Sequence, residues 1–129
     1  KSGAHFGVTP GMNSALYAAM EKSSLPIIPG VSTISEAMEA MEHGCDYVKL
    51  FPASQIGLKT VKSWCGPLGN ISICATGGLD FNSAKEWLEV PQVKMVGGGW
   101  MAPKEMLNKA VNGDVESLEI LRYNFQQLY

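Results

Sequence analysis

The chain has 129 residues, of which 46% are hydrophobic and 17% are charged, and its formal net charge is −2. This length and composition suit one globular domain with a real core and exclude a disordered chain. The absence of a basic run argues against nucleic acid as the main partner, and no apolar run is long enough to cross a bilayer. We therefore expect neither a nucleic-acid partner nor a membrane.

The three cysteines, Cys45, Cys65 and Cys74, show no C-x-x-C spacing. Free thiols in a reducing cytoplasm fit this pattern better than a disulfide framework or a zinc site. His5 and His43 are far apart in the sequence and match no ligand pattern. We therefore expect a cytoplasmic protein without a bound metal.

Five segments repeat one plan, in which a short apolar strand leads through a turn into an amphipathic stretch at helical spacing. The predicted strands cover residues 4–8, 25–28, 46–51, 71–75 and 93–96. The turns that follow them are Thr9-Pro10-Gly11, Pro29-Gly30, Gln55-Ile56-Gly57, Thr76-Gly77-Gly78 and Gly97-Gly98-Gly99.

Capping residues mark where the predicted helices begin. Asn13 caps the first helix, Thr33 and Glu36 form a capping box for the second, and Asp80 or Asn82 caps a later one. Two more helices are expected, one from Pro103 and one over residues 114–128. The apolar residues expected on the helices are Leu16, Tyr17, Met20, Ala37, Met38, Met41, Leu58, Val61, Trp64, Cys65, Ala84, Trp87, Leu88, Met106, Leu107, Val111, Leu118, Leu121 and Phe125.

Strands and helices that alternate at intervals of about 20–25 residues indicate a parallel sheet of βα units. The loops after parallel strands all open on one face, where ligands gather. Five units do not close an eight-stranded barrel, which needs roughly 200 residues or more. The chain is therefore an α/β protein, either an open doubly wound sheet or the last five βα units of a (β/α)₈ TIM barrel. In both cases residues 1–129 belong to a single domain.

A lysine interrupts the apolar run of the third predicted strand. Because side chains alternate along a strand, Tyr47, Lys49 and Phe51 share one face. Val48 and Leu50 share the other. An amine held between two aromatic rings loses hydration, which lowers its pKa and prepares it as a nucleophile. Two other interpretations stay open: an edge-strand lysine that deters aggregation, or one whose charged end reaches water past a buried stem.

The Gly-rich turns after the last two predicted strands favour the barrel over the open sheet. The loops after strands seven and eight of a barrel recurrently bind phosphate through backbone N–H groups. Thr76-Gly77-Gly78 and Gly97-Gly98-Gly99 would occupy those two places, although glycines can also serve only to make tight turns. The single arginine, Arg122, lies on the last helix, so anion recognition would rest on backbone amides and lysine.

Several motifs together resemble the family of 2-keto-3-deoxy-6-phosphogluconate (KDPG) aldolase, which also acts on 2-keto-4-hydroxyglutarate (KHG). They fall in the order and spacing of that family and cover nearly the whole chain, and Lys-x-Phe-Pro-Ala is the most specific. The matching segments are Thr9-Pro10-Gly11, Ile27–Thr33, Val48–Ala53, Ala75–Gly78 and Val96–Trp100.

The resemblance implies a (β/α)₈ barrel, usually a homotrimer, that acts as a class I aldolase in the Entner–Doudoroff pathway. Such an enzyme cleaves KDPG to pyruvate and glyceraldehyde 3-phosphate without a cofactor, through a covalent Schiff base on a lysine. Lys49 matches that lysine, and Phe51, Thr76 and Pro10 match positions that contact the keto acid substrate. The positions that match the phosphate cradle are Gly77, Gly78, Gly97, Gly98 and Gly99.

The chain departs from the family pattern at several points. Family members commonly have serine at the position of Gly99 and glutamate at that of Ser54. The family's catalytic glutamate and its carboxylate-binding arginine lie on early strands that this sequence lacks, and Asp80 fits a helix cap better than a base. Because residue 1 is Lys and not Met, we expect a chain that has been cut, tagged or truncated at its N-terminus. Because the glutamate base is absent, we expect no turnover by this chain alone. The preference among KDPG, its galactonate epimer and KHG stays open.

Two other functional interpretations remain. The chain could come from a phosphate-binding barrel isomerase or synthase in which Lys49 acts only as a charge. It could also be a non-catalytic partial barrel that self-associates, because an incomplete barrel exposes sheet edges and an apolar surface.

Overall fold

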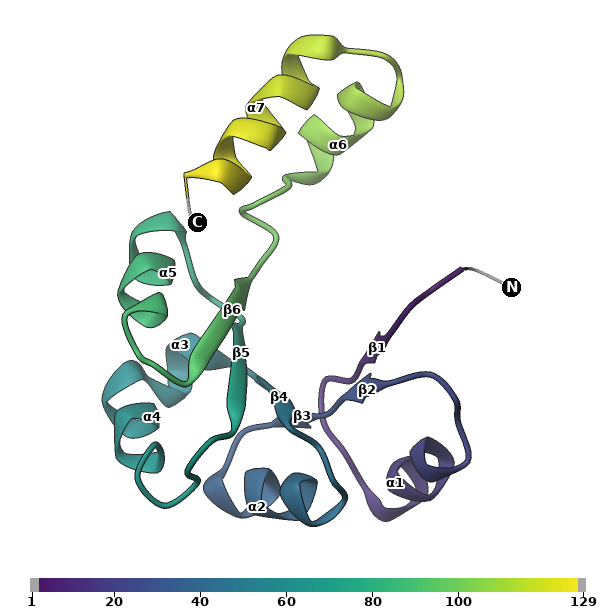
Figure 1. Cartoon of the computed structure of the whole chain (residues 1–129). Helices are drawn as coiled ribbons and strands as arrows, with labels where there is room; N and C mark the ends of the chain where they lie inside the picture. Colours follow the sequence, from purple (N-terminus) through teal and green to yellow (C-terminus); the bar gives the residue numbers. More distant parts are fainter. Residues whose placement is uncertain (1–2, 128–129) are drawn as a thin grey trace.

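The structure, a computed structural model that describes residues 3–127, is a curved row of short strands with helices along its outer side (Figure 1). Strands and helices alternate along most of the chain, as the sequence predicts. The elements are β1 (Gly7–Val8), α1 (Ser14–Glu21), β2 (Ile27–Ile28), β3 (Gly30–Val31), α2 (Ile34–Glu42), β4 (Tyr47–Leu50), α3 (Ala53–Ile56), α4 (Leu58–Trp64), β5 (Ser72–Thr76), α5 (Phe81–Leu88), β6 (Val93–Gly97), α6 (Lys104–Val111) and α7 (Val115–Gln126).

Every strand pair is parallel, and spatial neighbours follow chain order. β1 pairs with β2 in a two-stranded sheet, and β3, β4, β5 and β6 form a four-stranded sheet in that order. Parallel α/β architecture is thus confirmed. Within residues 3–127, no helix is long and apolar enough to cross a membrane.

The predicted turn at Pro29-Gly30 is wrong, because the chain stays extended there. Pro29 has no N–H, so it interrupts the ladder with β1 without reversing the chain. Its carbonyl accepts the N–H of Lys49 at 2.8 Å, and Gly30 continues as β3 beside β4. Residues 27–31 therefore join the two sheets. The segment predicted as the loop Gln55-Ile56-Gly57 also differs, since α3 extends through Ile56.

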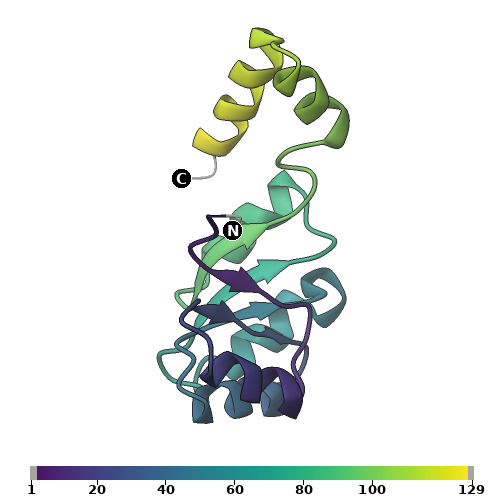
Figure 2. The ribbon, with the colours of Figure 1, turned by 90° about the vertical axis from the view of Figure 1, so that its right-hand side faces the viewer.

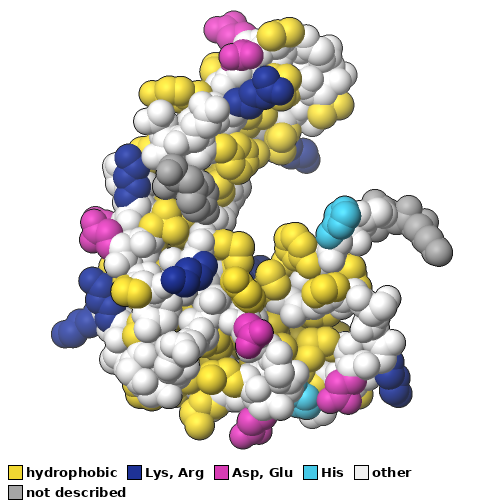
Figure 3. All heavy atoms as spheres, viewed as in Figure 1, with side chains coloured by type: hydrophobic (Ala, Val, Ile, Leu, Met, Phe, Trp, Pro, Cys, Tyr) yellow, Lys and Arg dark blue, Asp and Glu magenta, His cyan; other side chains and the backbone are white. Residues whose placement is uncertain are grey.

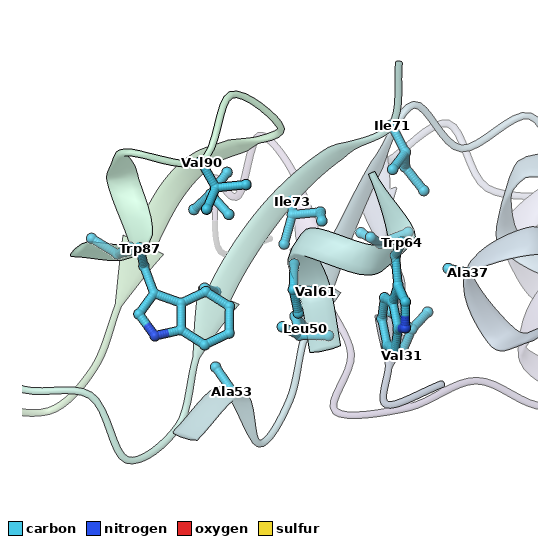
Figure 4. Packing of buried hydrophobic residues seen from close by; sticks show 14 of the residues in the cluster. Val31, Ala37, Leu50, Ala53, Val61, Trp64, Ile71, Ile73, Trp87 and Val90 are labelled. Carbon is cyan, nitrogen blue, oxygen red and sulfur yellow. The ribbon is translucent and has the colours of Figure 1, made fainter. Parts of the chain in front are cut away.

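The core lies between the four-stranded sheet and helices α2, α4 and α5 (Figure 4). Alternate strand residues such as Leu50 and Ile73 point to this outer layer and are fully buried. Helix residues Trp64 and Trp87 pack against them. The opposite side of the sheet, which we call the inner face, carries Tyr47, Lys49, Ser72, Cys74, Thr76 and Met95, none of which is buried.

The helix caps predicted from the sequence are confirmed. The Asn13 side chain accepts the N–H of Leu16, and Thr33 and Glu36 form a reciprocal capping box. Backbone N–H groups, first that of Ser32, lower the pKa of the Glu36 carboxyl. Of the two candidates for α5, Asp80 is the cap, and its side chain accepts the N–H of Ser83.

Several predicted helix faces are not covered by other elements. In α2 the buried residues are Ala37 and Ala40, whereas Met38 is 53% exposed.

Helices α6 and α7 pack on each other and project beyond the sheet (Figures 1 and 2). The predicted extension of the last helix to Leu128 lies outside the described residues. Apolar atoms line the side of this hairpin that faces the hollow of the molecule (Figure 3). The exposed apolar residues of the two helices are Leu107, Val111, Val115, Leu118, Ile120, Tyr123 and Phe125.

The packing of the outer layer predicts a large contrast between two truncations to alanine. Ile73, at 1% exposure, should lose about 2–5 kcal/mol of unfolding free energy as Ile73→Ala, because a cavity replaces its packing. Val111, at 84% exposure, should change by less than about 0.5 kcal/mol as Val111→Ala. Urea unfolding followed by tryptophan fluorescence measures both. Equal losses would contradict the assignment of the core to this layer.

Candidate functional site

Lys49 lies on the inner face, one residue before the end of β4. Its register partners are Gly30 on β3 and Cys74 on β5. The ammonium nitrogen lies over the Phe51 ring, 4.7 Å from the centroid, at a distance typical of cation–π contacts. No carboxylate lies within 4.0 Å of it among residues 3–127. The amine is therefore held by an aromatic ring without being neutralised by an ion pair.

The enclosure predicted for this amine is only partial. Lys49 is half-buried, Tyr47 is 46% exposed and Phe51 is 38% exposed. Alternation of side chains across β4 is as predicted, but the inner face has no second layer over it in the described residues. The amine can therefore be reached by solvent and by a ligand from the inner face.

Cys74 is a neighbour of Lys49 that the sequence analysis did not connect with the lysine. The two residues are cross-strand partners on the same face, the closest lateral position that a parallel sheet provides. Burial raises the pKa of the Cys74 thiol, while the charge of Lys49 acts in the opposite direction. Counting every second residue back from Thr76 would have placed Cys74 on this face.

Parallel pairing brings the two Gly-rich turns together at the carboxyl ends of the strands. Thr76 on β5 is the register partner of Gly97 on β6. This row lies two residues beyond the row of Lys49 and Cys74, which corresponds to roughly 7 Å along the strands. The lysine and both turns thus share one end of the inner face.

The turn after β5 is packed against the segment that follows Lys49. A Cβ added to Gly77 would lie 2.8 Å from the Phe51 ring, and the carbonyl of Gly77 accepts the N–H of Ser54 at 3.0 Å. Gly78 has a positive φ of 70° and contacts the Ser54 side chain. Only glycine fits this close approach without a shift of the neighbouring segment.

Thr76 and Pro10 also lie at this end of the sheet. The Thr76 hydroxyl makes a long hydrogen bond of 3.4 Å to the carbonyl of Leu50. The backbone of Pro10 packs on Gly30, whose N–H donates to the Thr9 hydroxyl at 3.0 Å. Because Gly30 pairs with Lys49, this contact sets Pro10 one strand away from the lysine.

The turn after β6 differs from the one after β5. A Cβ added to Gly98 would lie 2.7 Å from the Trp100 indole, and the carbonyl of Gly98 accepts the N–H of Met101 at 3.2 Å. Nothing lies within 4 Å of a Cβ added to Gly99. This turn therefore has one side against an indole and one side open.

Acidic groups and arginine are not brought to the lysine. Hydrogen bonds from Ser83, first from its backbone N–H, lower the pKa of the Asp80 carboxyl, which is engaged as a helix cap. Arg122 lies on α7 with Glu119 at 4.0 Å. Within residues 3–127, no group of three or more His, Cys, Asp or Glu side chains is placed to hold a metal ion.

A wide hollow lies at the other end of the strands. It measures about 550 Å³ and is lined by apolar residues that include Phe6, Ile27, Tyr47 and Met95. Lys49, Phe51 and the two glycine turns are not part of its lining. We therefore base the candidate site on the convergence of Lys49, Phe51 and the glycine turns, and not on cavity size.

Comparison with known proteins gives consistent matches. The model of the KDPG and KHG aldolase family matches residues 1–119. The 2-dehydro-3-deoxy-phosphogluconate aldolase of Pseudomonas aeruginosa is 41% identical over 92% of this chain and 54% of its own length. That of Dickeya dadantii is 36% identical over 93% of this chain and 55% of its own length. The chain thus spans about half the length of these curated relatives.

A solved structure matches in the same way. A KDPG aldolase from Legionella pneumophila, described with pyruvate captured as a covalent carbinolamine intermediate, superposes with a TM-score of 0.80 at 36% identity. The match covers 89% of this chain and 56% of that chain.

The contact between Gly78 and Ser54 predicts a loss of stability larger than that of a glycine with similar φ and free space. Gly44, with a φ of 76°, has nothing within 4 Å of an added Cβ, so Gly44→Ala should cost about 1–2 kcal/mol for the left-handed backbone alone. Gly78→Ala should cost about 1–3 kcal/mol more, because the new methyl group collides with Ser54.

Urea unfolding of the two variants measures this difference. Adding Ser54→Ala to Gly78→Ala removes the hydroxyl and should recover part of the extra loss. Equal stability of the Gly44 and Gly78 variants would show that the turn after β5 does not pack against Ser54.

Proposed function

Because the chain belongs to the KDPG and KHG aldolase family, we propose that it derives from a class I aldolase whose Schiff-base lysine is Lys49. The proposed reaction cleaves KDPG of the Entner–Doudoroff pathway to pyruvate and glyceraldehyde 3-phosphate. Residues 1–129 would form the last five βα units of a single (β/α)₈ barrel domain. The parallel strands in chain order, with helices along one side only, support this assignment.

The observation that carries the proposal is a primary amine without a carboxylate partner beside two glycine turns. The Lys49 nitrogen would attack the C2 carbonyl of the keto acid to give a carbinolamine, which loses water to an iminium ion. The C3–C4 bond then breaks, the aldehyde leaves, and the electron pair stays on pyruvate as an enamine. Protonation at C3 and addition of water release pyruvate and restore the amine. None of these reaction steps needs a cofactor.

Other residues of the site would hold the substrate. Phe51 contacts the Lys49 ammonium and would line the pocket beside the imine. Thr76 ends β5, the strand beside β4, and Pro10 packs on Gly30, the register partner of Lys49. Both would contact the keto acid. The phosphate would bind to backbone N–H groups of the two turns, roughly 7 Å farther along the strands. The residues proposed for that cradle are Gly77, Gly78, Gly97, Gly98 and Gly99.

We further propose that the 129-residue chain associates with copies of itself, as a trimer in the intact enzyme. The exposed apolar residues of α6 and α7 and the open inner face support association, because single-chain surfaces rarely leave such areas uncovered. Three free cysteines suit a cytoplasmic protein.

Trapping with borohydride tests the role of Lys49. Incubation with pyruvate and sodium borohydride should attach a reduced pyruvyl group to Lys49, located by peptide mass mapping, because borohydride reduces the iminium to a stable secondary amine. Lys49→Arg keeps the charge and should abolish the adduct. Lys94→Arg, at an exposed position of β6, serves as the matched control and should leave it unchanged.

The absence of an adduct at all pyruvate concentrations would remove the Schiff-base mechanism and leave the family assignment intact. If Lys49→Arg retained the function of the intact protein, the lysine would act only as a charge, as in an isomerase or synthase.

The 129-residue chain by itself should cleave KDPG slowly. Cleavage also requires a base that removes the C4 hydroxyl proton, and no acidic side chain lies beside Lys49 in the described residues. KDPG cleavage by the 129-residue chain should therefore be at least about a hundredfold slower than that of the full-length Pseudomonas aeruginosa relative, since general base catalysis commonly contributes this much. Pyruvate release coupled to lactate dehydrogenase measures both rates. Similar rates would show that these residues supply their own base.

A further inference from the structure

Trp100 carries a buried polar atom that no other residue satisfies. Its indole nitrogen, Nε1, is the one buried side-chain nitrogen or oxygen in the described range that lacks a hydrogen-bond partner. An indole N–H can only donate a hydrogen bond, so the missing partner is an acceptor. A buried donor without a partner costs roughly 1–3 kcal/mol, and native proteins rarely leave one unsatisfied.

The neighbours of the indole place this donor at the turn after β6. Nε1 lies 2.7 Å from the position of a Cβ on Gly98, so the ring covers one side of the Gly97–Gly99 turn. The hydrogen bond from Met101 N–H to the carbonyl of Gly98 closes the turn that carries Trp100. The Phe81 ring packs edge-on against the indole at 6.1 Å with an angle of 80°. The indole is therefore held against the glycines by packing from α5.

The charges around this ring pair favour an anionic acceptor. Lys85 lies over the Phe81 ring at 4.4 Å and brings a positive charge to this group of aromatic residues. The Asp80 carboxylate, which caps the N-terminus of α5, is engaged by the backbone N–H and the hydroxyl of Ser83. The glycines themselves offer only backbone N–H groups, so Trp100 is the side chain of this turn that can add a donor.

We propose that Trp100 Nε1 donates a hydrogen bond to an oxyanion, a phosphate group, bound at the Gly97–Gly99 turn. This inference rests on the proposed function, in which the turn holds the phosphate end of the substrate. Trp100 is then a residue that determines specificity for phosphorylated keto acids over unphosphorylated ones such as KHG. It makes no contact with the reacting carbonyl and has no part in the chemistry at Lys49.

Titration of the ¹⁵N-labelled chain with inorganic phosphate tests the proposal directly. The indole N–H resonance of Trp100 should move downfield and saturate together with the backbone amides of residues 97–99. Trp64 and Trp87, which are buried in the outer core, are internal controls whose indole resonances should stay in place.

The outcomes separate this inference from the proposed function. If the glycine amides shift and the Trp100 indole does not, the phosphate site stands and the role of Trp100 is wrong. If neither shifts, phosphate does not bind at this turn and both proposals fail.

Replacement of the N–H by sulfur provides a second measurement. A benzothienylalanine at position 100 keeps the size and shape of the indole and removes only the donor. It should weaken phosphate binding at least about tenfold, because hydrogen bonds to charged groups contribute about 1.5 kcal/mol or more. The same replacement at position 87 should leave phosphate affinity unchanged. Unchanged affinity at position 100 would overturn the proposal.

Discussion

Parallel pairing of β4, β5 and β6 is the constraint on which the candidate site depends. Register places Lys49 beside Cys74 and Thr76 beside Gly97, so residues far apart in the sequence meet on one face. The same pairing sends Val48 and Leu50 to the opposite face, where helices cover them. A shift of one residue would exchange the two faces and bury the lysine in the outer core. The chemistry and the hydrophobic core are thus fixed by one set of backbone hydrogen bonds.

Local signals in the sequence were sufficient for much of this arrangement. Side-chain alternation predicted which residues of β4 share a face, and the caps at Asn13, Thr33 and Asp80 were readable from single residues with known geometry. Proline was less informative. At Pro29 the missing N–H breaks one ladder while the carbonyl joins another, and that outcome depends on β4, which is distant in the sequence.

Other features depended on the surroundings of a residue, which a single chain does not encode locally. Met38 has helical spacing suited to a core, yet the small residues Ala37 and Ala40 make the contact with the sheet. The two rings near Lys49 enclose it less than their positions suggest, since the inner face has no covering layer here. Trp100 looked like part of a motif, and only its burial against Gly98 exposed an unsatisfied donor.

The separation of the two faces of the sheet has a consequence for how such a protein can evolve. Residues of the outer layer carry the packing, whereas inner-face positions such as Tyr47, Ser72 and Met95 bury little of their surface in it. Exchanges at these inner positions can reshape the open surface on the side of Lys49 with small effects on folding, so new binding properties are accessible by drift. Libraries for altered ligand binding are best confined to that side.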